Sequence, residues 1–230
     1  MSVSFIPPSI IWPKTSEEAV AIQNDLCQRV RIANELDNLK IIAGIDVSYD
    51  IKTNLTRAFI VLLHYETLQP ITSVKAIVPT TFPYIPGFLS FREIPAILEA
   101  MKQLSIKPDL LMVDGQGIAH PRHLGIAAHL GVLLDMPTIG VAKSRLVGHH
   151  REVGPHKDDY VPLMFKSEQV GIVLRSKHHV KPLYISPGHR VNHLTALRIT
   201  QHCLTRYRLP EPTRLADKLS KEKQPEPALL

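Results

Sequence analysis

The side chains best suited to chemistry gather in one stretch, residues 110–145, with the sequence LLMVDGQGIAHPRHLGIAAHLGVLLDMPTIGVAKSR. Its first apolar run is too short for a typical helix and ends in Asp114. It therefore predicts a buried strand that brings a carboxylate to its C-terminal edge, where open α/β sheets place their ligands. A glycine-rich turn and His120 follow, and a second short strand over 138–141 leads to Lys143. An Asp-Gly pair alone is typical of a tight turn, but the added basic side chains favour a site for a phosphate and a divalent cation.

A second carboxylate, Asp46, interrupts the apolar run over residues 40–49, KIIAGIDVSY, which otherwise predicts a central strand. Desolvating an unpaired carboxylate is costly, so we expect a cation or a strong donor beside it. The alternative is an edge-strand aspartate that faces water. If the strands of Asp46 and Asp114 are neighbours, the two carboxylates repel each other and raise a pKa unless a divalent cation lies between them. Oxygen ligands favour Mg²⁺ or Mn²⁺ over zinc.

Residues 80–92, TTFPYIPGFLSFR, predict a loop that two prolines stiffen but that carries several apolar side chains. Two interpretations stay open. The apolar side chains fold back onto the core, or they wedge between stacked bases as in proteins that deform a duplex. Ser90 can cap the following helix, with Glu93 at its third position. Glu93 is therefore either half of a capping box or a member of the acidic site.

The other segments predict the scaffold around these residues. Thr15 is expected to cap a helix that extends to about residue 36. Three strands over 40–49, 57–65 and 71–78 are expected to form an antiparallel meander. Beyond residue 160 we expect strands over 170–175 and 182–185, a turn or helix entry over 186–190, a helix over 192–207 and a short last helix that carries Asp217.

This order predicts an α/β fold, with a mixed sheet and helices on both faces. In that sheet an antiparallel meander is followed by parallel strands. We expect one domain over residues 1–230. Residues 1–14, rich in proline, predict an extended N-terminal arm, and residues 221–230 predict a flexible tail.

Composition narrows the class of protein. The chain has 230 residues, of which 44% are hydrophobic, enough for a conventional core. A net charge of +6 suggests a polyanionic partner, although ordinary soluble proteins also carry such a charge. Cys27 and Cys203 indicate neither a disulfide framework nor a zinc site. With no signal peptide and no apolar run of membrane length, we expect a cytoplasmic protein without a membrane partner.

With Glu93, Lys143 and Asp217 added, the two aspartates resemble the residue set of metal-assisted phosphodiester hydrolysis. The motifs that carry these residues are GIDVSY with Asp46, FPYIPGFLSFRE over 82–93, DGQGIAHPRHLGIAAHLG over 114–131, PTIGVAKSRL over 137–146, SPGH over 186–189 and EPTRLAD ending at Asp217. The resemblance extends over nearly the whole chain, from about residue 15 to residue 220. The set resembles endonuclease V, a family of ribonuclease-H-like nucleases that recognise deaminated adenine.

The resemblance implies roles for the charged residues. Asp46 and Asp114 would bind a catalytic Mg²⁺, for which Mn²⁺ would substitute, and Glu93 would complete the acidic site. Asp217 stands where the family has a fourth group on the metal side, either aspartate or histidine. Lys143 would stabilise the scissile phosphate.

The resemblance also implies how a base is recognised. Residues Pro83, Tyr84, Ile85 and Pro86 match the wedge of the family, in which Tyr84 is inserted at the lesion while the flipped hypoxanthine enters a pocket. The expected pocket residues are Gly87, Leu89, Gly115 and Leu146. His120 would contact phosphate next to Lys143. The family cuts the second phosphodiester bond 3′ to the lesion and leaves 3′-hydroxyl and 5′-phosphate ends.

The expected activity is that of a monomeric DNA repair endonuclease acting at deoxyinosine in duplex or single-stranded DNA. An alternative is an inosine-specific endoribonuclease, because some members of the family prefer RNA and motifs do not show the 2′-hydroxyl contacts that discriminate. A third possibility is a lesion-binding protein without catalysis. The intact Asp46, Glu93, Asp114 and Lys143 argue against it.

Overall fold

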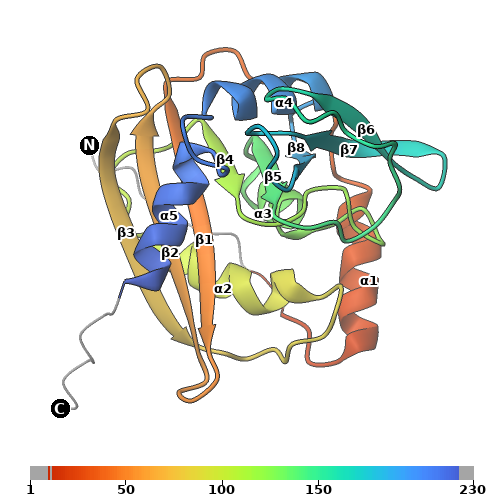
Figure 1. Ribbon diagram of the computed structural model, residues 1–230. Coiled ribbons are helices and arrows are strands. Elements are labelled where there is room, and N and C mark those ends of the chain that lie inside the picture. Colours follow the sequence, from red (N-terminus) through yellow and green to blue (C-terminus); the bar gives the residue numbers. More distant parts are fainter. Residues whose placement is uncertain (1–9, 11, 223–230) are drawn as a thin grey trace.

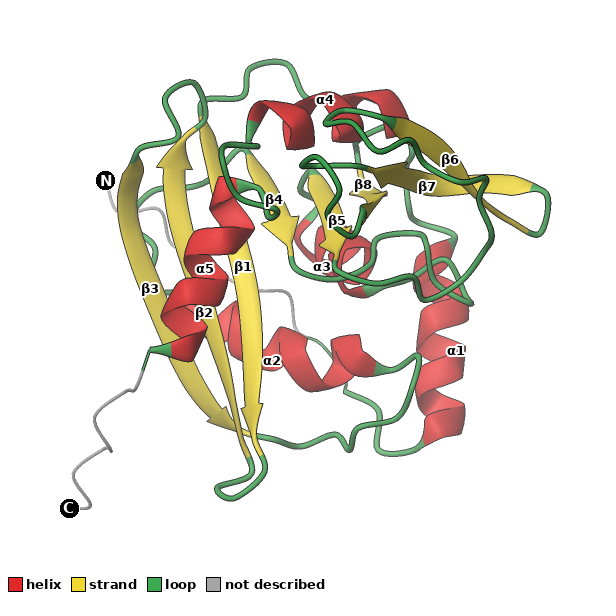
Figure 2. Cartoon of the chain, viewed as in Figure 1, coloured by secondary structure: helices red, strands yellow, loops and turns green. Residues whose placement is uncertain are grey.

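The computed structural model describes residue 10 and residues 12–222 (Figures 1 and 2). This part of the chain forms one eight-stranded sheet and five helices. The strands are β1 Ile41–Asp50, β2 Leu55–His64, β3 Pro70–Pro79, β4 Leu110–Val113, β5 Thr138–Ala142, β6 Tyr160–Phe165, β7 Glu168–Leu174 and β8 Leu183–His189. The helices are α1 Ser16–Cys27, α2 Leu89–Met101, α3 Ile126–Leu134, α4 His193–His202 and α5 Glu211–Lys221.

The sheet is mixed, with the strand order β3-β2-β1-β4-β5-β8-β7-β6. Strands β1 to β3 form the expected antiparallel meander, and β4 and β5 run parallel to β1. Within the pair β1 and β4, Ile45 lies opposite Val113. Asp46 and Asp114 each follow one of these residues, so the pairing brings both carboxylates to one edge. The predicted α/β fold with a mixed sheet is confirmed.

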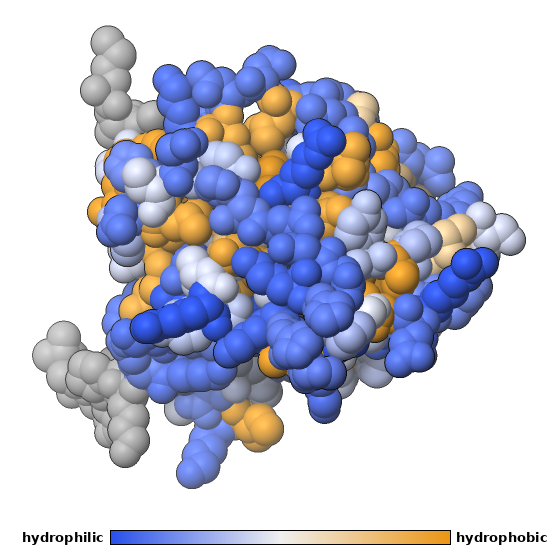
Figure 3. Space-filling view, turned by 45° about the horizontal axis from the view of Figure 1, so that its top comes forward, coloured by the Kyte–Doolittle hydropathy of each residue, from blue (hydrophilic) through white to orange (hydrophobic). Residues whose placement is uncertain are grey.

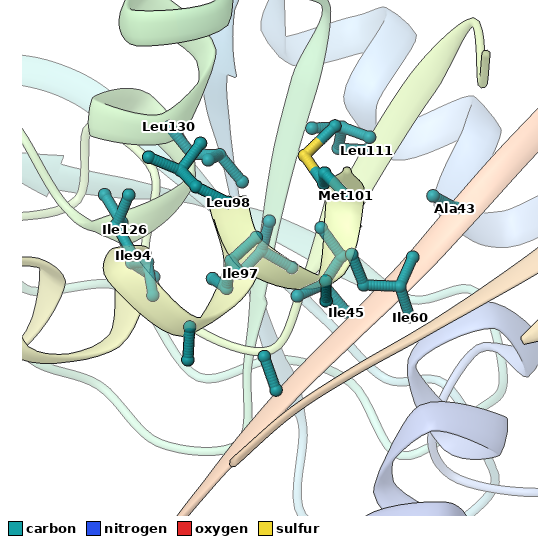
Figure 4. Close-up of a cluster of buried hydrophobic side chains, with 14 of the residues drawn as sticks. Ala43, Ile45, Ile60, Ile94, Ile97, Leu98, Met101, Leu111, Ile126 and Leu130 are labelled. Atoms are coloured by element: carbon teal, nitrogen blue, oxygen red, sulfur yellow. The ribbon is translucent and has the colours of Figure 1, made fainter. Parts of the chain in front are cut away.

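Helices cover both faces of the sheet, and each face has its own apolar core. Alternate residues of β1 point to opposite sides, as the period of a strand requires. Ile45 packs with residues of α2 and α3 in one cluster (Figure 4), whereas Ile42 packs with residues of α4 and α5 in another. Each fully buried isoleucine or leucine stabilises the fold by about 1.5–3 kcal/mol.

Helix α5 lies directly against β1, in front of it in Figure 1, while α2 lies behind. At Gly44 an added Cβ would be 1.9 Å from the carbonyl oxygen of Pro212, so no side chain fits between strand and helix. This close contact carries Asp217, one turn further along α5, toward the edge where Asp46 lies.

Two helices are shorter than the sequence predicts. Thr15 caps α1, with its hydroxyl accepting from the Glu18 amide at 3.2 Å, but α1 ends at Cys27 instead of near residue 36. Beyond it, the backbones of Arg31 and Glu35 bond to that of Arg190, and these tertiary bonds replace those of a longer helix. Helix α4 has the expected start but ends at His202.

The strand prediction was incomplete around the SPGH motif. Residues 186–189 lie inside β8 and not in a turn or helix entry. Pro187 is accommodated there because the pairing of β5 with β8 shifts register between Thr138 and Ile139, and the Pro187 carbonyl accepts from the Ile118 amide instead. Strand β6, which pairs with β7 as a hairpin, was not predicted.

The expectations for the two ends fall mostly on residues 1–9, 11 and 223–230, which lie outside the described part of the chain. Within it, Trp12 packs against the apolar core, and α5 extends to Lys221 where the tail was expected to begin. None of the helices described here is long and apolar enough to cross a membrane.

Candidate active site

Three aspartates meet at the edge of the sheet. Asp46 comes from β1, Asp114 directly follows β4, and Asp217 comes from α5. One carboxylate oxygen from each lies within 4.8 Å of the other two. We call these three residues the acidic group. The structure thus brings Asp46 and Asp114 together as predicted and gives Asp217 an equal place beside them.

Lys143, which follows β5, bridges two members of the acidic group. Its Nζ lies 2.5 Å from an Asp114 oxygen and 2.6 Å from an Asp217 oxygen. Burial alone would lower the pKa of Lys143, but hydrogen bonds and charge attraction from both carboxylates outweigh burial and raise the pKa above its ordinary value. Lys143 is therefore a firmly charged ammonium group at the centre of the site.

Burial dominates the electrostatics of Asp46, which is only 8% exposed. Desolvation, reinforced by the charge of Asp114, raises the pKa of Asp46 to about 6 even though the Ser220 side chain stabilises the carboxylate. For Asp217 burial acts in the same direction, but Lys143 and Lys221 outweigh it and lower the pKa. The three carboxylates of the acidic group therefore carry more negative charge than the neighbouring lysines neutralise.

Glu93 lies near the acidic group but is not part of it. The family resemblance implies that Glu93 is a metal ligand with Asp46 and Asp114, and that role stays a prediction. Among the described residues, the third carboxylate that converges with those two is Asp217. Burial, together with the charges of Asp46 and Asp114, raises the pKa of Glu93 to about 8. Glu93 comes from α2 on the opposite face of the sheet, and that separate origin explains why spacing along the chain could not fix its distance from the aspartates.

The acidic group fits a divalent cation by the chemistry of its donors. Three converging carboxylate oxygens without histidine or cysteine form a set of hard ligands, which suits cations such as Mg²⁺ and Mn²⁺ better than zinc. A cation there would also offset the burial and the repulsion from Asp114 that together raise the pKa of Asp46. The three acidic residues can therefore hold a metal ion.

A pocket of about 130 Å³ opens beside this site. It is lined by Tyr84, Ile85, Pro86, Gly87, Leu89, Ser90, Gln116, His120, Leu124, Gly125, Ile126 and Leu146. Its wall is mainly apolar, which suits a planar base. Of the predicted contact residues, Pro83 and Gly115 do not line it.

The pocket is connected to the acidic site through Gln116. This residue lies two positions after Asp114, and its Nε2 donates to the carbonyl of Ser144, one position after Lys143, at 3.0 Å. Sequence reasoning missed Gln116 as a pocket residue, although its place between two singled-out residues was a usable signal. It also missed Leu124, Gly125 and Ile126, which reach the pocket only because α3 packs there.

In the loop over residues 80–88, some apolar side chains fold back onto the core and Tyr84 does not. Phe82 and Phe88 are buried with Phe91, and their rings lie 5.7 to 6.4 Å apart. Tyr84, in contrast, is 67% exposed at the mouth of the pocket. The phenylalanines thus anchor the loop on the core, while Tyr84 remains available to a ligand.

Arg92, on helix α2, connects the loop over residues 80–88 to strand β1. Its guanidinium carbon lies 3.4 Å from the ring centre of Tyr49 and 5.8 Å from that of Tyr84, so cation–π contacts join β1 to the loop. A band of hydrophilic side chains crosses the middle of the face shown in Figure 3, with hydrophobic patches on either side.

The capping role for Ser90 and Glu93 is wrong. Helix α2 begins at Leu89, after the positive φ of Gly87, with Phe88 at the N-cap. Ser90 therefore lies inside the helix, and its hydroxyl is 2.9 Å from Nδ1 of the buried His129. Burial of Phe88 in the aromatic cluster starts the helix earlier than the polar capping signal suggests.

His120 lies at the pocket and not among the carboxylates. Its Nε2 is 3.0 Å from the carbonyl oxygen of Gly87. Burial, together with the nearby charge of Arg122, lowers the pKa of His120 to about 4, so the ring is neutral near pH 7. The predicted phosphate contact of His120 stays a prediction.

Residues 24–218 match the family model of endonuclease V. The chain belongs to the endonuclease V family. It is 52% identical over 211 residues to endonuclease V of Rippkaea orientalis, covering 92% of each chain. Membership makes the protein a nuclease, and it confirms the family resemblance that the motifs carry.

Solved structures of the family agree with the fold. The crystal structure of endonuclease V from Streptomyces avermitilis matches with a TM-score of 0.87 at 40% identity, covering 91% of this chain and 93% of that one. Endonuclease V of Ciona intestinalis, in complex with a 24-mer DNA containing an inosine followed by a ribo-adenosine, matches with a TM-score of 0.77 at 28% identity, covering 90% and 96%. The sheet and its helices therefore have the ribonuclease-H-like architecture of endonuclease V.

Proposed function

We propose that this protein recognises deoxyinosine in DNA and hydrolyses the second phosphodiester bond 3′ to it, leaving 3′-hydroxyl and 5′-phosphate ends. One observation carries the proposal: a mainly apolar pocket bordered by the exposed Tyr84 lies near the acidic group and the charged Lys143 that bridges two of its members. The inosine-containing DNA bound by the Ciona relative supports the same class of substrate.

Asp46, Asp114 and Asp217 would hold the cation, which we propose is Mg²⁺ with Mn²⁺ as a substitute. When bound, the cation activates a water molecule and neutralises charge on the phosphate. Lys143 places its ammonium group where negative charge develops on the scissile phosphate. Glu93, with a pKa of about 8, can hold a proton near the reacting oxygens at neutral pH.

At the lesion, Tyr84 would stack in the place that the extruded base vacates. Unstacking and unpairing a base costs a few kcal/mol, of which an inserted aromatic ring recovers about 1–3 kcal/mol. The flipped hypoxanthine would lie between Leu89 and Leu146 in the pocket. Gly87 lies at the turn that lets the loop close over it, and its φ of +84° favours glycine.

RNA remains the alternative substrate for the same site. The DNA in the Ciona complex carries a ribonucleotide directly after the inosine. A 2′-hydroxyl at that position is therefore compatible with binding by that relative. In this alternative the acidic group, Lys143 and Tyr84 keep the same functions, and only the strand that they accept differs.

An end-labelled strand with one inosine, cut in Mg²⁺ and mapped to one nucleotide, tests the proposal. Matched DNA and RNA strands of one sequence, with adenine in place of inosine as controls, separate the two substrates. We expect a single cut, at the second bond 3′ to inosine, that EDTA abolishes. Cleavage that ignores inosine, or that persists in EDTA, contradicts the proposal.

A further inference from the structure

The carbonyl oxygen of Gly87 receives three side-chain donors. Nε2 of Gln23 lies 2.9 Å from it, and Nε2 of His120 and Nη2 of Arg122 each lie 3.0 Å from it. A carbonyl oxygen has two lone pairs, so the three donors share it, and the charged donor from Arg122 makes the strongest of these contacts. It lies at the end of the loop over residues 80–88 that presents Tyr84.

The contacts among these side chains fix which atoms donate. Nδ1 of His120 accepts from the Arg122 amide at 3.2 Å, so the proton of the neutral ring is on Nε2, which donates to Gly87. Nε of Arg122 donates to Oε1 of Gln23, whose amide nitrogen is thereby turned toward the same carbonyl. Gln23 is fully buried, although it lies on α1, far from the acidic group in sequence.

Arg122 holds its charge here without an acidic partner. None of the described carboxylates lies within ion-pair distance of its guanidinium group, which instead stacks over the Phe88 ring at 4.6 Å. Burial lowers the pKa of Arg122 from its ordinary value. Its Nε and Nη2 donors hold the loop through Gln23 and the Gly87 carbonyl.

These three residues control the pocket through Gly87. Gly87 and His120 both line it, and Tyr84 lies three residues before Gly87. At Gly87 an added Cβ would be 3.0 Å from Nη2 of Arg122, so a side chain there would push on the guanidinium group. Displacing the Gly87 carbonyl would shift Tyr84 and the pocket wall together.

We propose that Gln23, His120 and Arg122 are positioning residues that hold the Gly87 carbonyl and thereby keep the Tyr84 loop in the arrangement that accepts an extruded base. His120 then acts as a neutral donor to the loop and not as a cation to phosphate. The proposal rests on the proposed function for its substrate, a strand containing inosine.

Variants of His120 separate the two roles. In H120Q a neutral amide nitrogen reaches approximately the position of Nε2 and can donate to Gly87. In H120K the ammonium group can serve a phosphate, but it places a second cation beside that of Arg122 at the same carbonyl. We expect H120Q to keep most of its activity on the inosine duplex and H120K to lose lesion engagement. The opposite order would overturn the proposal.

Q23L tests the network from α1, with Q103L as the matched control because exposed Gln103 donates to the Lys75 carbonyl away from the pocket. Q23L loses both its bond to the Gly87 carbonyl and the acceptor of Arg122 Nε. We expect it to need about tenfold more inosine duplex for half-maximal rate. The rate at saturation should stay within about twofold of the wild type, because the acidic group is untouched. A Q23L enzyme equal to wild type and Q103L, or one that loses only the saturating rate, refutes the role.

Hydrogen exchange gives a readout that does not depend on cleavage. Amides over residues 82–88 should exchange faster in Q23L than in wild type or Q103L, while those of β1 and β4 stay protected. If Q23L does not fold, R122K, which keeps the charge but loses the fork, replaces it in the same measurement. Wild-type exchange in a folded variant contradicts the proposal. Failure of the wild type to cut inosine strands would count against the proposed function alone.

Discussion

The acidic group and the cluster of donors around the Gly87 carbonyl differ in how their charges and hydrogen bonds are satisfied. The acidic group places three like-charged oxygens within 4.8 Å of one another, supplied by two strands and a helix. The cluster around the Gly87 carbonyl is made of donors that all find an acceptor. The first can hold a cation between its carboxylates, whereas the donors of the second bond to groups of the protein itself.

This difference separates chemistry from positioning. Under the proposed function, repulsion in the acidic group favours a divalent cation at the place where the phosphate would react. The cluster at Gly87 gains nothing from a ligand and instead fixes the loop that a base must meet. Changes in the acidic group should therefore alter the rate of cleavage, and changes at the loop should alter engagement of the lesion.

The largest effect is expected from D46N and D114N. Each removes a charged oxygen from the cation site while leaving the pocket in place, so cleavage in Mg²⁺ should be abolished and lesion binding should largely survive. Single-turnover cleavage and binding to an inosine duplex in EDTA measure the two properties. D25N, at an exposed position on α1, is the matched control. Near-normal turnover of either site variant would show that the acidic group does not hold the catalytic cation.

A smaller loss is expected from K143A. A lysine at the scissile phosphate matters most when charge develops there, so the saturating rate should fall by about 10²–10³-fold with a much smaller loss of binding. K218A removes an exposed lysine of α5 and should change neither. A K143A enzyme that binds weakly but turns over normally at saturation would move Lys143 from catalysis to simple backbone contact.

Most residues on the reaction side could be predicted from the sequence because local pattern determines their position. Asp46 interrupts an apolar strand, and Asp114 and Lys143 follow short ones, so strand pairing alone brings them together. The distances of Asp217 and Glu93 from that edge depend on how α5 and α2 pack. For this reason the roles of these two in the cation site were not fixed by spacing.

The loop side was harder to predict because its contacts are tertiary. Gln23 resembles a surface residue of an amphipathic helix, and nothing near it in sequence shows that it is fully buried against Gly87. Likewise, the sequence around Ser90 is typical of a helix cap, but α2 begins earlier, at Leu89, because Phe88 is buried. A side chain that hydrogen-bonds to a backbone group far away along the chain leaves no periodic pattern in the sequence.

Y84A sharpens the comparison on the loop side. Loss of stacking worth about 1–3 kcal/mol should weaken binding to an inosine duplex by roughly 5- to 150-fold. The effect should be smaller on a single strand, where the base has no partner to lose. Because Tyr84 is 67% exposed, the melting temperature should hardly change.

Y160A, which truncates an exposed tyrosine of the β6–β7 hairpin, is the matched control for Y84A. It should leave both affinities unchanged. Destabilisation by Y84A with equal losses on duplex and single strand would make Tyr84 a core residue and would refute the wedge.

The smallest effect is expected in the stability of the metal-free protein. Burial raises the pKa of Asp46 from 3.8 to about 6, so the folded state binds a proton more tightly than the unfolded state. The stabilisation that this proton provides is complete below about pH 4 and is lost as the pH rises through 6. Glu93, whose pKa is raised to about 8, extends the loss to higher pH.

The melting temperature in EDTA should therefore fall between pH 5 and pH 8, and Mg²⁺ should restore more of it at pH 8 because only the charged carboxylates bind the cation. D46N removes one charge that must be buried, so its melting temperature in EDTA at pH 8 should equal or exceed that of wild type by a few degrees, with a flatter pH profile. D25N should follow the wild type. A large loss of stability in metal-free D46N at every pH would instead mean that the Asp46 carboxylate stabilises the fold. The acidic group would then be a structural cluster, like the donors at the Gly87 carbonyl, and the contrast between the two would fail.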